Sequence, residues 1–379
     1  MVEMTRSERI IAASHKKRAD RMPFFHYWRH SQIGWAEREC RNRGMGMCWV
    51  RPPYVQKIHG GVEMTEKQVV SSGVNVLRRT YTTPVGTIWC DEKRARGTEQ
   101  WHALRSWQDI APWQTERLIK GPEDYKVLKY MVENTEYIAD YFPIEQAMDW
   151  LGDDGIVIDA LPHSPFQMLM IDWIGSEGGR FYIHHAKYPD LVEELYQATS
   201  KNRDAMYEIA AKSPAPVTAC GDNIDGVLVN PRLFEKYFMP EYEKEARLIH
   251  EQGKLMYVHM DGRVNNIKHL IAKTPIDIIE ALHAPPMGDL PIGEALSLWP
   301  DKVIWTGYPG SVYTLGPEAV KKHALDLLRD VIPGERLVFQ VSTENLVSNE
   351  NMLMLTSVLE NATLPLTMDK IDEIERSLK

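Results

Sequence analysis

The sequence predicts an α/β fold: a (β/α)8 barrel of the TIM type, with an aromatic-rich N-terminal extension that contains a β-hairpin. From about residue 155 onward, short β-rich runs alternate with helical patterns, which is typical of parallel α/β architectures. No Gly-x-Gly-x-x-Gly motif follows the first of these runs, as it would in a dinucleotide-binding sheet. Six of the eight strands that a barrel needs can be read directly. A barrel is therefore favoured over a doubly wound sheet.

The first part of the chain, residues 1–150, is expected to form the extension that covers the barrel, and residues 151–379 to form the barrel itself. Aromatic, Arg and His residues crowd together in the extension, as in RMPFFHYWRH at 21–30. Residues 73–93 carry β-branched runs around a Thr-Pro-Val-Gly turn signal, which predicts a β-hairpin. Residues 121–142 have a proline near their start, acidic residues in the first turn and then apolar residues at helical spacing, so they predict a helix.

The barrel strands are expected where apolar and β-branched residues form short continuous runs, and its helices where apolar residues recur at helical spacing. The six readable strands cover residues 155–161, 215–220, 254–260, 276–282, 302–307 and 336–342. Helical patterns lie between and after them at 189–212, 231–253, 262–273, 316–331 and 349–361. The strand–helix repeat therefore extends to about residue 361.

Composition and charge exclude several classes of protein. Of the 379 residues, 44% are hydrophobic and 26% are charged, as in ordinary soluble globular proteins. The formal net charge of −9 argues against a nucleic-acid partner, because phosphate contacts need clustered Lys and Arg. No stretch approaches the roughly 18 apolar residues of a membrane span, and the N-terminus lacks the apolar segment of a secretory signal. The four cysteines are dispersed, so we expect reduced thiols in a cytoplasmic protein that does not act at a membrane.

Polar side chains follow the predicted strands at the points where those strands end. Because the carboxyl ends of parallel barrel strands meet at one rim, these side chains are expected to converge on one pocket. A charge there needs a partner or a metal, since an isolated buried charge costs many kcal/mol. The residues concerned are His163, Asp222 with Asn223, His259 with Asp261, Glu280 with His283, Tyr308, and Thr343 with Glu344.

Two interpretations of these charges are open. A single His or Glu that ends a strand is more often a helix cap or a hydrogen-bonded group than a ligand. Three strands that end in His259-x-Asp261, Glu280 and Glu344 favour a common functional site, because caps have no reason to recur at one rim. One imidazole and up to three carboxylates form a credible Zn²⁺ set. Alternatively, some of the carboxylates are general acids or partners that orient His259.

Several motifs together resemble the uroporphyrinogen decarboxylase superfamily. They are GDNIDG (221–226), VHMDG (258–262), IIEALHAPPMGDL (278–290) and WTGYPG (305–310), and RMPFFHYWR (21–29) is similar to the Arg-Pro-aromatic segment near that family's start. The resemblance covers roughly residues 120–370 well and the N-terminal part loosely. Within the superfamily the sequence looks like the methyltransferase branch, and most of all like the substrate-side methyltransferase of anaerobic O-demethylases. Such a protein passes methyl groups to a separate corrinoid protein.

The resemblance implies a zinc site, with one departure from the family pattern. In that branch, and in the related cobalamin-independent methionine synthase, zinc is held by a His-x-Cys pair, a Glu on the next strand and a distal Cys. His259 and Glu280 match that order, whereas Asp261 stands in place of the first Cys and Glu344 lies near the place of the second. The implied metal ligands are therefore His259, Asp261, Glu280 and Glu344. Asp261 and Glu344 are also candidates for catalytic acid–base roles.

Oxygen ligands in place of thiolates would make the zinc a stronger Lewis acid, suited to an ether whose phenolate leaves reluctantly. We therefore expect a methoxylated, aromatic small-molecule substrate and a corrinoid cofactor, carried by a corrinoid-binding protein that docks over the barrel mouth. Tyr308 would pack against the corrinoid or the substrate ring in a catalytic role, and a packing role alone fits its position equally well. The candidates for substrate contacts are Asp222, Asn223, His163 and His283, with Trp28 and Trp113 as an apolar wall around the ring.

Two other functions are open at this point. A decarboxylase of the superfamily would bind a polycarboxylated tetrapyrrole through N-terminal arginines, and this chain keeps Arg29 but lacks the Arg-Gln-Ala-Gly-Arg signature. A non-enzymatic barrel that lost its zinc with the cysteines would only bind a methylated compound or a corrinoid protein. Dimers are the commonest oligomers of soluble proteins, so a homodimer is the default expectation.

Overall fold

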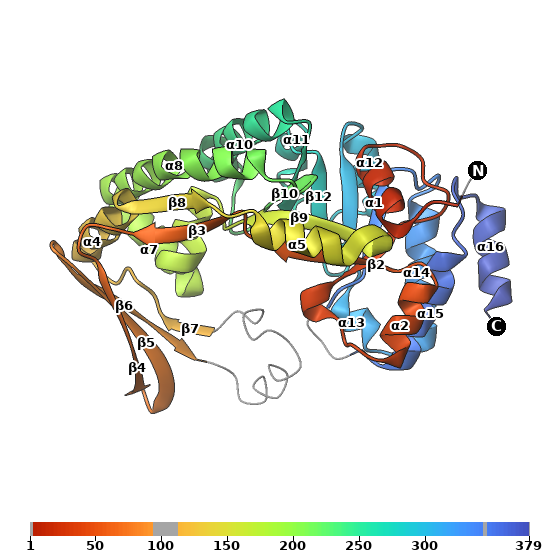
Figure 1. Cartoon of the computed structure of the whole chain (residues 1–379), viewed down its shortest axis with the longest axis horizontal. Coiled ribbons are helices and arrows are strands. Elements are labelled where there is room, and N and C mark those ends of the chain that lie inside the picture. Colours follow the sequence, from red (N-terminus) through yellow and green to blue (C-terminus); the bar gives the residue numbers. More distant parts are fainter. Residues whose placement is uncertain (1–2, 94–112, 344–346, 379) are drawn as a thin grey trace. The chain divides into compact units, whose positions relative to one another are not determined.

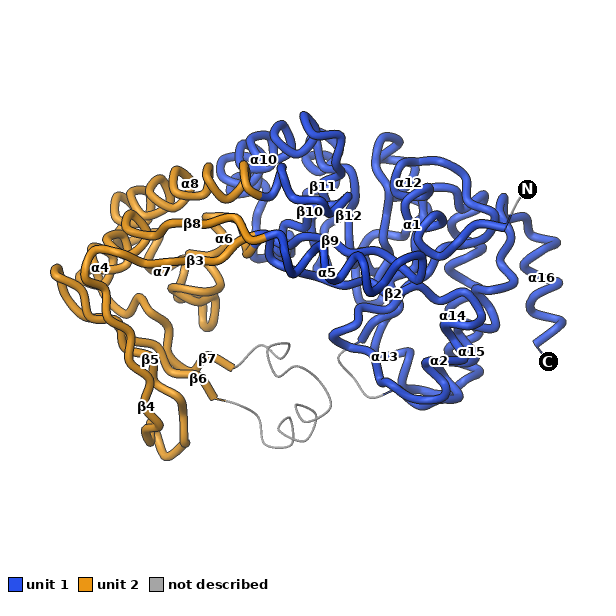
Figure 2. Tube along the Cα trace, viewed as in Figure 1, with its two compact units in different colours: residues 1–53, 141–161, 210–379 blue, residues 54–140, 162–209 orange. Residues whose placement is uncertain are grey.

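The computed structural model describes residues 3–93, 113–343 and 347–378. The chain forms two compact units, which Figure 2 draws in two colours. Unit 1 comprises Met1–Pro53, Tyr141–Leu161 and Ala210–Lys379, and unit 2 comprises Tyr54–Asp140 and Pro162–Ile209. Both units are discontinuous in sequence, because the chain passes from unit 1 into unit 2 twice.

Unit 1 contains a closed barrel of eight parallel strands with helices around it, which confirms the predicted (β/α)8 architecture (Figure 1). Successive strands are neighbours in the barrel, and pairing of the last strand with the first closes it. All six strands read from the sequence are present, within two residues of their expected bounds. The strands are β1 (Phe24–Tyr27), β2 (Gly46–Arg51), β9 (Gly155–Leu161), β10 (Val217–Cys220), β11 (Leu255–His259), β12 (Ile278–Leu282), β13 (Val303–Gly307) and β14 (Leu337–Gln340).

The other two strands, β1 and β2, come from the stretch that was expected to form an extension. They are short, and aromatic and sulfur-containing side chains outnumber the β-branched residues that usually signal a strand. Most of unit 2 is inserted between β2 and β9, so the strand–helix alternation is interrupted after the second strand. The structure therefore differs from the expected boundary at residue 150: the barrel begins at Phe24.

Side chains that alternate along the strands fill the barrel interior. The buried core contains Phe25, Tyr27, Cys48, Ile156, Ile158, Val217, Ala219, Tyr257, Ile278, Val303, Trp305 and Val338. The helix α1 (Arg6–Ser14) closes the amino end of the barrel and adds Ile10 and Ala13 to this core. The Trp305 indole donates a 3.2 Å hydrogen bond to the Ser14 hydroxyl, which fixes α1 to the barrel floor. An active site is therefore expected at the other end of the barrel, at the carboxyl ends of the strands.

Helices cover the outside of the barrel (Figure 1). Those of unit 1 are η1 (Trp28–His30), α2 (Trp35–Asn42), α5 (Phe142–Leu151), η3 (Gly152–Asp154), α9 (Pro231–Leu233), η6 (Phe234–Phe238), α10 (Met239–Glu251), α11 (Lys268–Ile271), α12 (Ile292–Leu298), α13 (Gly310–Tyr313), α14 (Pro317–Asp330), α15 (Asn349–Glu360) and α16 (Met368–Ser377). In the parts of the chain that the structure describes, no helix is both long and apolar enough to span a membrane.

A buried ion pair fastens the outer face of the barrel wall. Asp159 alternates with the inward-facing Ile158 in β9 and therefore points outward. The Lys254 ammonium donates 2.8 Å hydrogen bonds to the Asp159 carboxylate and to the Ser213 hydroxyl, which itself bonds Asp159. Burial raises the pKa of Asp159 and lowers the pKa of Lys254, and the attraction between the two charges opposes both shifts. Each charge depends on the other to remain in the interior.

Unit 2 consists of two antiparallel sheets and a group of helices. The hairpin predicted over 73–93 is present as β5 and β6. The helix predicted over 121–142 ends at Glu133, because the β-branched and aromatic residues after Asn134 form β8 instead. The strands are β3 (Tyr54–Ile58), β4 (Glu63–Ser71), β5 (Val74–Thr83), β6 (Gly86–Lys93), β7 (Trp113–Glu116) and β8 (Thr135–Ala139). The helices are α4 (Pro122–Glu133), α6 (Pro165–Gln167), η4 (Met168–Trp173), η5 (Glu177–Gly179), α7 (Arg180–Lys187) and α8 (Pro189–Lys212), whose last residues belong to unit 1.

Candidate active site at the carboxyl ends of the barrel strands

His259 and Glu280 lie side by side at the carboxyl ends of β11 and β12, where they are register partners in the parallel sheet. Tyr257 and Ile278, two residues earlier, belong to the barrel core, so strand alternation directs His259 and Glu280 inward as well. His259 Nδ1 donates a 2.5 Å hydrogen bond to Glu280 Oε2. Two of the polar residues predicted to converge at the rim are thus in direct contact.

Glu280 is almost fully buried, with 2% of its side chain exposed. The Tyr27 hydroxyl donates a 2.9 Å hydrogen bond to Glu280 Oε1, and the Tyr257 hydroxyl lies 3.4 Å from the Tyr27 hydroxyl. Burial, and then the negative charge of Glu280, raise the pKa of both tyrosines well above the ordinary value. Both phenols therefore stay protonated, and Tyr27 acts as a hydrogen-bond donor to the carboxylate.

A β-bulge directly after Glu280 shapes this corner of the rim. The register between β12 and β13 shifts between Glu280 and Leu282, and Ala281 adopts a left-handed conformation with φ of 57°. A non-glycine residue in this conformation carries strain of about 1–2 kcal/mol. Bulges of this kind re-aim side chains at barrel rims. The strained residue, Ala281, is therefore the direct neighbour of Glu280, which carries the buried negative charge.

Asp261 flanks the other side of the His259 ring. Its Oδ2 lies 3.6 Å from His259 Nε2, which is too far for a direct hydrogen bond. Burial lowers the pKa of His259, but the Glu280 and Asp261 carboxylates outweigh burial and raise this pKa to about 10. Burial also acts to raise the pKa of Asp261, and the interaction with His259 reverses that effect, so the pKa is lowered. The ring thus lies between two carboxylates that together favour a positive charge.

His283 adds a second imidazole from the loop after β12. Its ring packs against Gly307, the last residue of β13, so closely that a Cβ at Gly307 would lie 2.4 Å from His283 Cε1. Burial lowers the pKa of His283, although the nearby Asp261 and Glu280 charges oppose this effect. His283 is therefore a neutral imidazole at neutral pH. Its Nδ1 is buried and has no hydrogen-bond partner among the residues that the structure describes.

Two aspartates fasten the loops that follow β10, β11 and β12. Asp225, after β10, accepts a 3.0 Å hydrogen bond from the Arg263 N–H in the loop after β11. Asp289, after β12, accepts hydrogen bonds of 2.8 and 3.0 Å from the Val264 and Asn265 N–H groups in the same loop. The loop that carries the VHMDG motif is thus held from both sides, which fixes the backbone around the candidate site.

Asp222, Asn223 and Tyr308, three of the residues assigned to substrate or corrinoid, lie in packed surroundings. Asp222 is fully buried and accepts a 2.7 Å hydrogen bond from the Tyr242 hydroxyl in α10, and Asn223 beside it is half-buried. Tyr308 is also buried, and its hydroxyl donates a 2.8 Å hydrogen bond to the Val320 carbonyl. These contacts give Asp222 and Tyr308 structural roles, and their roles toward a substrate stay predictions.

The aromatic wall and His163 have separate surroundings. Trp28 packs on Trp49, with ring centroids 5.1 Å apart, and Trp49 points away from the barrel interior because the neighbouring residues of β2 face inward. His163 and Trp113 belong to unit 2. There His163 Nδ1 bonds Asp172 at 2.8 Å, and Trp113 is 68% exposed. The substrate roles of Trp28, Trp113 and His163 stay predictions.

A metal centre fits part of the predicted ligand set. Across residues 3–93, 113–343 and 347–378, no three His, Cys, Asp or Glu side chains are arranged to hold one ion. His259 Nε2 and Asp261 Oδ2 face each other as nitrogen and oxygen donors of the kind that zinc binds. Glu280 accepts a hydrogen bond from His259 Nδ1, as carboxylates commonly do from metal-bound histidines. Glu344, the fourth expected ligand, lies outside the described residues, so the described donors fit Glu280 best as the residue that orients His259.

The sequence did not single out Tyr27 or Gly307, which both shape this cluster. Tyr27 lies in an aromatic stretch that the sequence does not identify as a strand. The alternation of Phe25 and Tyr27 in RMPFFHYWR was the available signal, since it directs both side chains to one face of a strand. Gly307 belongs to the glycine-bearing motif WTGYPG, and the position of the His283 ring explains why a glycine is needed there.

Known proteins resemble the chain in structure rather than in sequence. No protein-family model and no curated protein matches it. A solved methyltransferase from Methanosarcina mazei superposes with a TM-score of 0.55 over 98% of this chain and 100% of that chain, at 13% identity. A B12-independent methionine synthase from Shewanella sp. W3-18-1 (TM-score 0.40, 72% and 73% covered, 12% identity) and endo-glycoceramidase II from Rhodococcus sp. (0.33, 62% and 66%, 14%) are less similar. The chain thus has the barrel fold of a solved methyltransferase, as its resemblance to the methyltransferase branch implied.

Proposed function

We propose that the protein is a zinc-dependent methyltransferase that moves a methyl group from a methoxylated aromatic compound to the cobalt of a corrinoid carried by a separate protein. The observation that carries this proposal is the His259 ring between Glu280 and Asp261. It lies at the carboxyl end of the barrel, where enzymes of this fold have their active sites. The fold shared with a methyltransferase and the resemblance of the rim motifs support the proposal.

The charge balance of the cluster favours a divalent cation. Glu280 is buried and Asp261 is half-exposed, and both carboxylates act on the His259 ring, whose pKa they raise to about 10. Among the described residues, neither carboxylate forms an ion pair with a Lys or Arg. Without a metal, the proton on His259 supplies the positive charge that these carboxylates need. A divalent ion bound at Nε2 would replace that proton and supply the positive charge in its place.

His259 Nε2 and Asp261 would hold the zinc, with Glu344 as the further predicted ligand, and the zinc would act as a Lewis acid toward the ether oxygen. By accepting Nδ1–H, Glu280 selects the His259 tautomer that leaves Nε2 free for the metal. Tyr27 holds Glu280 in this position through its own hydrogen bond. The residues behind the ligands thus determine which way the imidazole faces.

In the proposed reaction the methyl–oxygen bond would break with its electron pair left on the oxygen, and a reduced corrinoid on the partner protein would supply the nucleophile that accepts the methyl group. Aryl methyl ethers are poor methyl donors because the departing phenolate needs stabilisation. We assign His283 to this oxygen. A neutral imidazole can donate a hydrogen bond to it, and the buried Nδ1 of His283 has no partner among the described residues.

Metal analysis combined with a methyl-transfer assay tests the proposal. The purified protein should bind one zinc per chain and should convert reduced free cobalamin to methylcobalamin with methoxylated aromatic donors but not with methylamines. The variant His259→Ala should lose both zinc and activity. His269→Ala is the matched control, because His269 is an exposed histidine in α11 and its loss should leave both unchanged.

The other outcomes separate the competing functions. A protein that binds no zinc but still binds a methoxylated ring would be a non-enzymatic binder. Release of carbon dioxide from a polycarboxylated tetrapyrrole, without methyl transfer, would identify a decarboxylase. Zinc retained in full by His259→Ala would refute the metal site, whatever the activity of the protein.

A further inference from the structure

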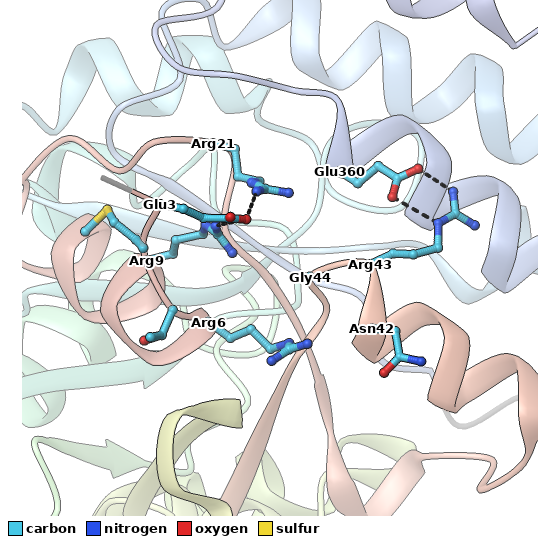
Figure 3. Close-up of a pocket in the computed structure, with 10 residues that line it drawn as sticks. Glu3, Arg6, Arg9, Arg21, Asn42, Arg43, Gly44 and Glu360 are labelled. Carbon is cyan, nitrogen blue, oxygen red and sulfur yellow. Dashed lines mark hydrogen bonds and ion pairs between the residues drawn. The ribbon is translucent and has the colours of Figure 1, made fainter. Parts of the chain in front are cut away.

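A second, positively charged cavity lies at the opposite, amino end of the barrel in unit 1. It has a volume of about 370 Å³ and lies between the start of α1, the segment before β1, the loop between α2 and β2, and the end of α15. Its charged lining consists of Arg6, Arg9, Arg21 and Arg43 with Glu3 and Glu360. Guanidinium groups therefore outnumber carboxylates in its wall. Figure 3 shows Arg9 and Arg21 grouped around Glu3, and Arg43 beside Glu360.

Three of these arginines bond carboxylates through Nη2, and two of the three also through Nε, whereas their Nη1 groups are left for another acceptor. Arg9 donates to Asp20 through Nε and Nη2, at 2.6 and 2.9 Å. Arg43 likewise donates to Glu360 through Nε and Nη2. Arg21 Nη2 donates to Glu3 at 2.5 Å. The Nη1 groups of Arg9, Arg21 and Arg43 have no acceptor among the residues that the structure describes.

Two of these free groups converge above a glycine. The Nη1 atoms of Arg9 and Arg21 each lie 3.9 Å from the point that a Cβ of Gly44 would occupy, and Gly44 has a φ of +107°. The backbone conformation favours glycine, and the absence of a side chain leaves room between the two cations. Two guanidinium groups this close to a common point are within reach of one tetrahedral oxyanion.

Glu3 lies beside this position, on the Nη2 atoms of the same two arginines. Its carboxylate accepts the hydrogen bond from Arg21 and lies 3.7 Å from Arg9 Nη2, yet the side chain is 75% exposed. An ion pair this exposed is weak, with a median contribution of about 0–1 kcal/mol. The Glu3 carboxylate can therefore turn into solvent when a stronger anion arrives.

We propose that this cavity binds the phosphate group of a small molecule, which replaces the Glu3 carboxylate on Arg9 and Arg21. A phosphate carries more charge and more acceptor oxygens than a carboxylate, so it can accept hydrogen bonds from the Nη groups of Arg9 and Arg21 at the same time. The volume suits a small ligand. The net charge of −9 makes a nucleic acid an unsuitable source of the phosphate. The site lies at the opposite end of the barrel from the rim cluster and stands independently of the proposed methyl transfer.

Calorimetric titration tests the site, with inorganic phosphate and glycerol 3-phosphate as separate probes and acetate at equal ionic strength as the reference. We expect one phosphate per chain, with acetate at least tenfold weaker. Tighter binding of glycerol 3-phosphate than of inorganic phosphate would assign the site to a phosphate monoester, and the reverse order would assign it to the free ion. No phosphate binding, or equal binding of acetate, would overturn the proposal.

Two substitutions with opposite expected effects sharpen the test. Glu3→Gln removes the competing carboxylate from an exposed position and should tighten phosphate binding severalfold. Arg21→Gln removes one of the two guanidinium groups and should weaken phosphate binding at least tenfold. Arg38→Gln is the matched control, since Arg38 is an exposed arginine of α2 outside the cavity. If Glu3→Gln leaves the affinity unchanged, or if Arg21→Gln behaves like Arg38→Gln, the arginines form only a structural ion-pair cluster.

Discussion

The Tyr27 hydroxyl donates a hydrogen bond to the Glu280 carboxylate across 253 residues of sequence. Tyr27 ends β1 and Glu280 lies in β12, and β13 and β14 separate these strands in the barrel wall. The bond therefore crosses the barrel interior and does not follow the sheet. It makes the first strand part of the same cluster as His259, whose ring bonds the other oxygen of Glu280.

Removing the charge of Glu280 should weaken metal binding while the fold survives. In Glu280→Gln the shape of the side chain is kept, but the carboxylate that orients His259 is lost, and zinc affinity should fall about 10- to 100-fold. Tyr27→Phe, which leaves the charge in place, should have a smaller effect. Zinc affinity is measured by competition with a chelator. Tyr125→Phe is the control, because it deletes a buried hydroxyl that bonds His184 in unit 2; equal losses in all three variants would contradict the assignment.

A methyl group at Gly307 should disturb the substrate side of the site and leave the metal side intact. The new Cβ would lie 2.4 Å from His283 Cε1, so Gly307→Ala must displace that ring. We expect KM for the methyl donor to rise about tenfold, or about 1.4 kcal/mol, with zinc content unchanged. A double-mutant cycle with His283→Ala gives the control. If Gly307→Ala has the same effect in both backgrounds, contact with His283 is not the cause.

Replacing only one residue of the buried Asp159–Lys254 pair should destabilise the protein, whereas replacing both should not. Lys254→Met leaves the Asp159 carboxylate buried without a cation and should lower the free energy of unfolding by about 3–5 kcal/mol. Combining it with Asp159→Leu should recover most of this loss, because no charge is then left in the interior. Urea denaturation measures both effects. Lys268→Met, which breaks a more exposed pair with Glu294, should change stability by less than about 1 kcal/mol.

The surface pair of His250 and Asp277 should make stability depend on pH. Its hydrogen bond to Asp277 raises the pKa of His250 above 6.5, against the opposing effects of burial and of the Lys16 charge. A raised pKa in the folded state stabilises the protein below the unfolded pKa, and this contribution is lost as the pH rises through the folded pKa. Because the His250 side chain is 38% exposed, the difference should not exceed about 1 kcal/mol. Urea unfolding at pH values from below the unfolded pKa to above the folded pKa of His250 measures this difference in stability.

A substitution isolates this contribution from the other titrating groups. His250→Gln should remove the additional stability below the unfolded pKa and leave the stability above the folded pKa nearly unchanged. His269→Gln should leave the whole pH profile as in the parent protein. A profile of His250→Gln that still follows the parent would show that other groups determine the pH dependence.

The sequence predicted the later strands of the barrel well, because each is an apolar run bounded by helical patterns, as in GIVIDAL and KVIWTG. It did not predict β1 and β2, since aromatic residues in β1 and the long insertion after β2 conceal the repeat. It also could not predict that residues 54–140 and 162–209 form one unit. That arrangement depends on contacts between the two segments, such as the hydrogen bond between the Tyr125 hydroxyl and His184 Nδ1.

The contact between His259 and Glu280 could be predicted because both residues end neighbouring strands, and barrel geometry brings strand ends together. Asp222 was harder to interpret. It also follows a strand, but the Tyr242 hydroxyl of α10 binds it in the helical layer, and no pattern in the sequence indicates this partner. Strand alternation gives the direction of side chains within a strand, and it no longer applies where the loop begins.

The parallel pairing of β1 with β14, through Phe24 with Phe339 and Phe25 with Gln340, has a consequence for biosynthesis. β1 is synthesised before the other seven barrel strands, but its second neighbour, β14, is the last of them to be made. Until then its edge is unpaired and its aromatic side chains are open to unwanted association. Contacts so far apart along the chain also slow folding. A nascent chain of this protein should therefore depend on chaperones until β14 has been made.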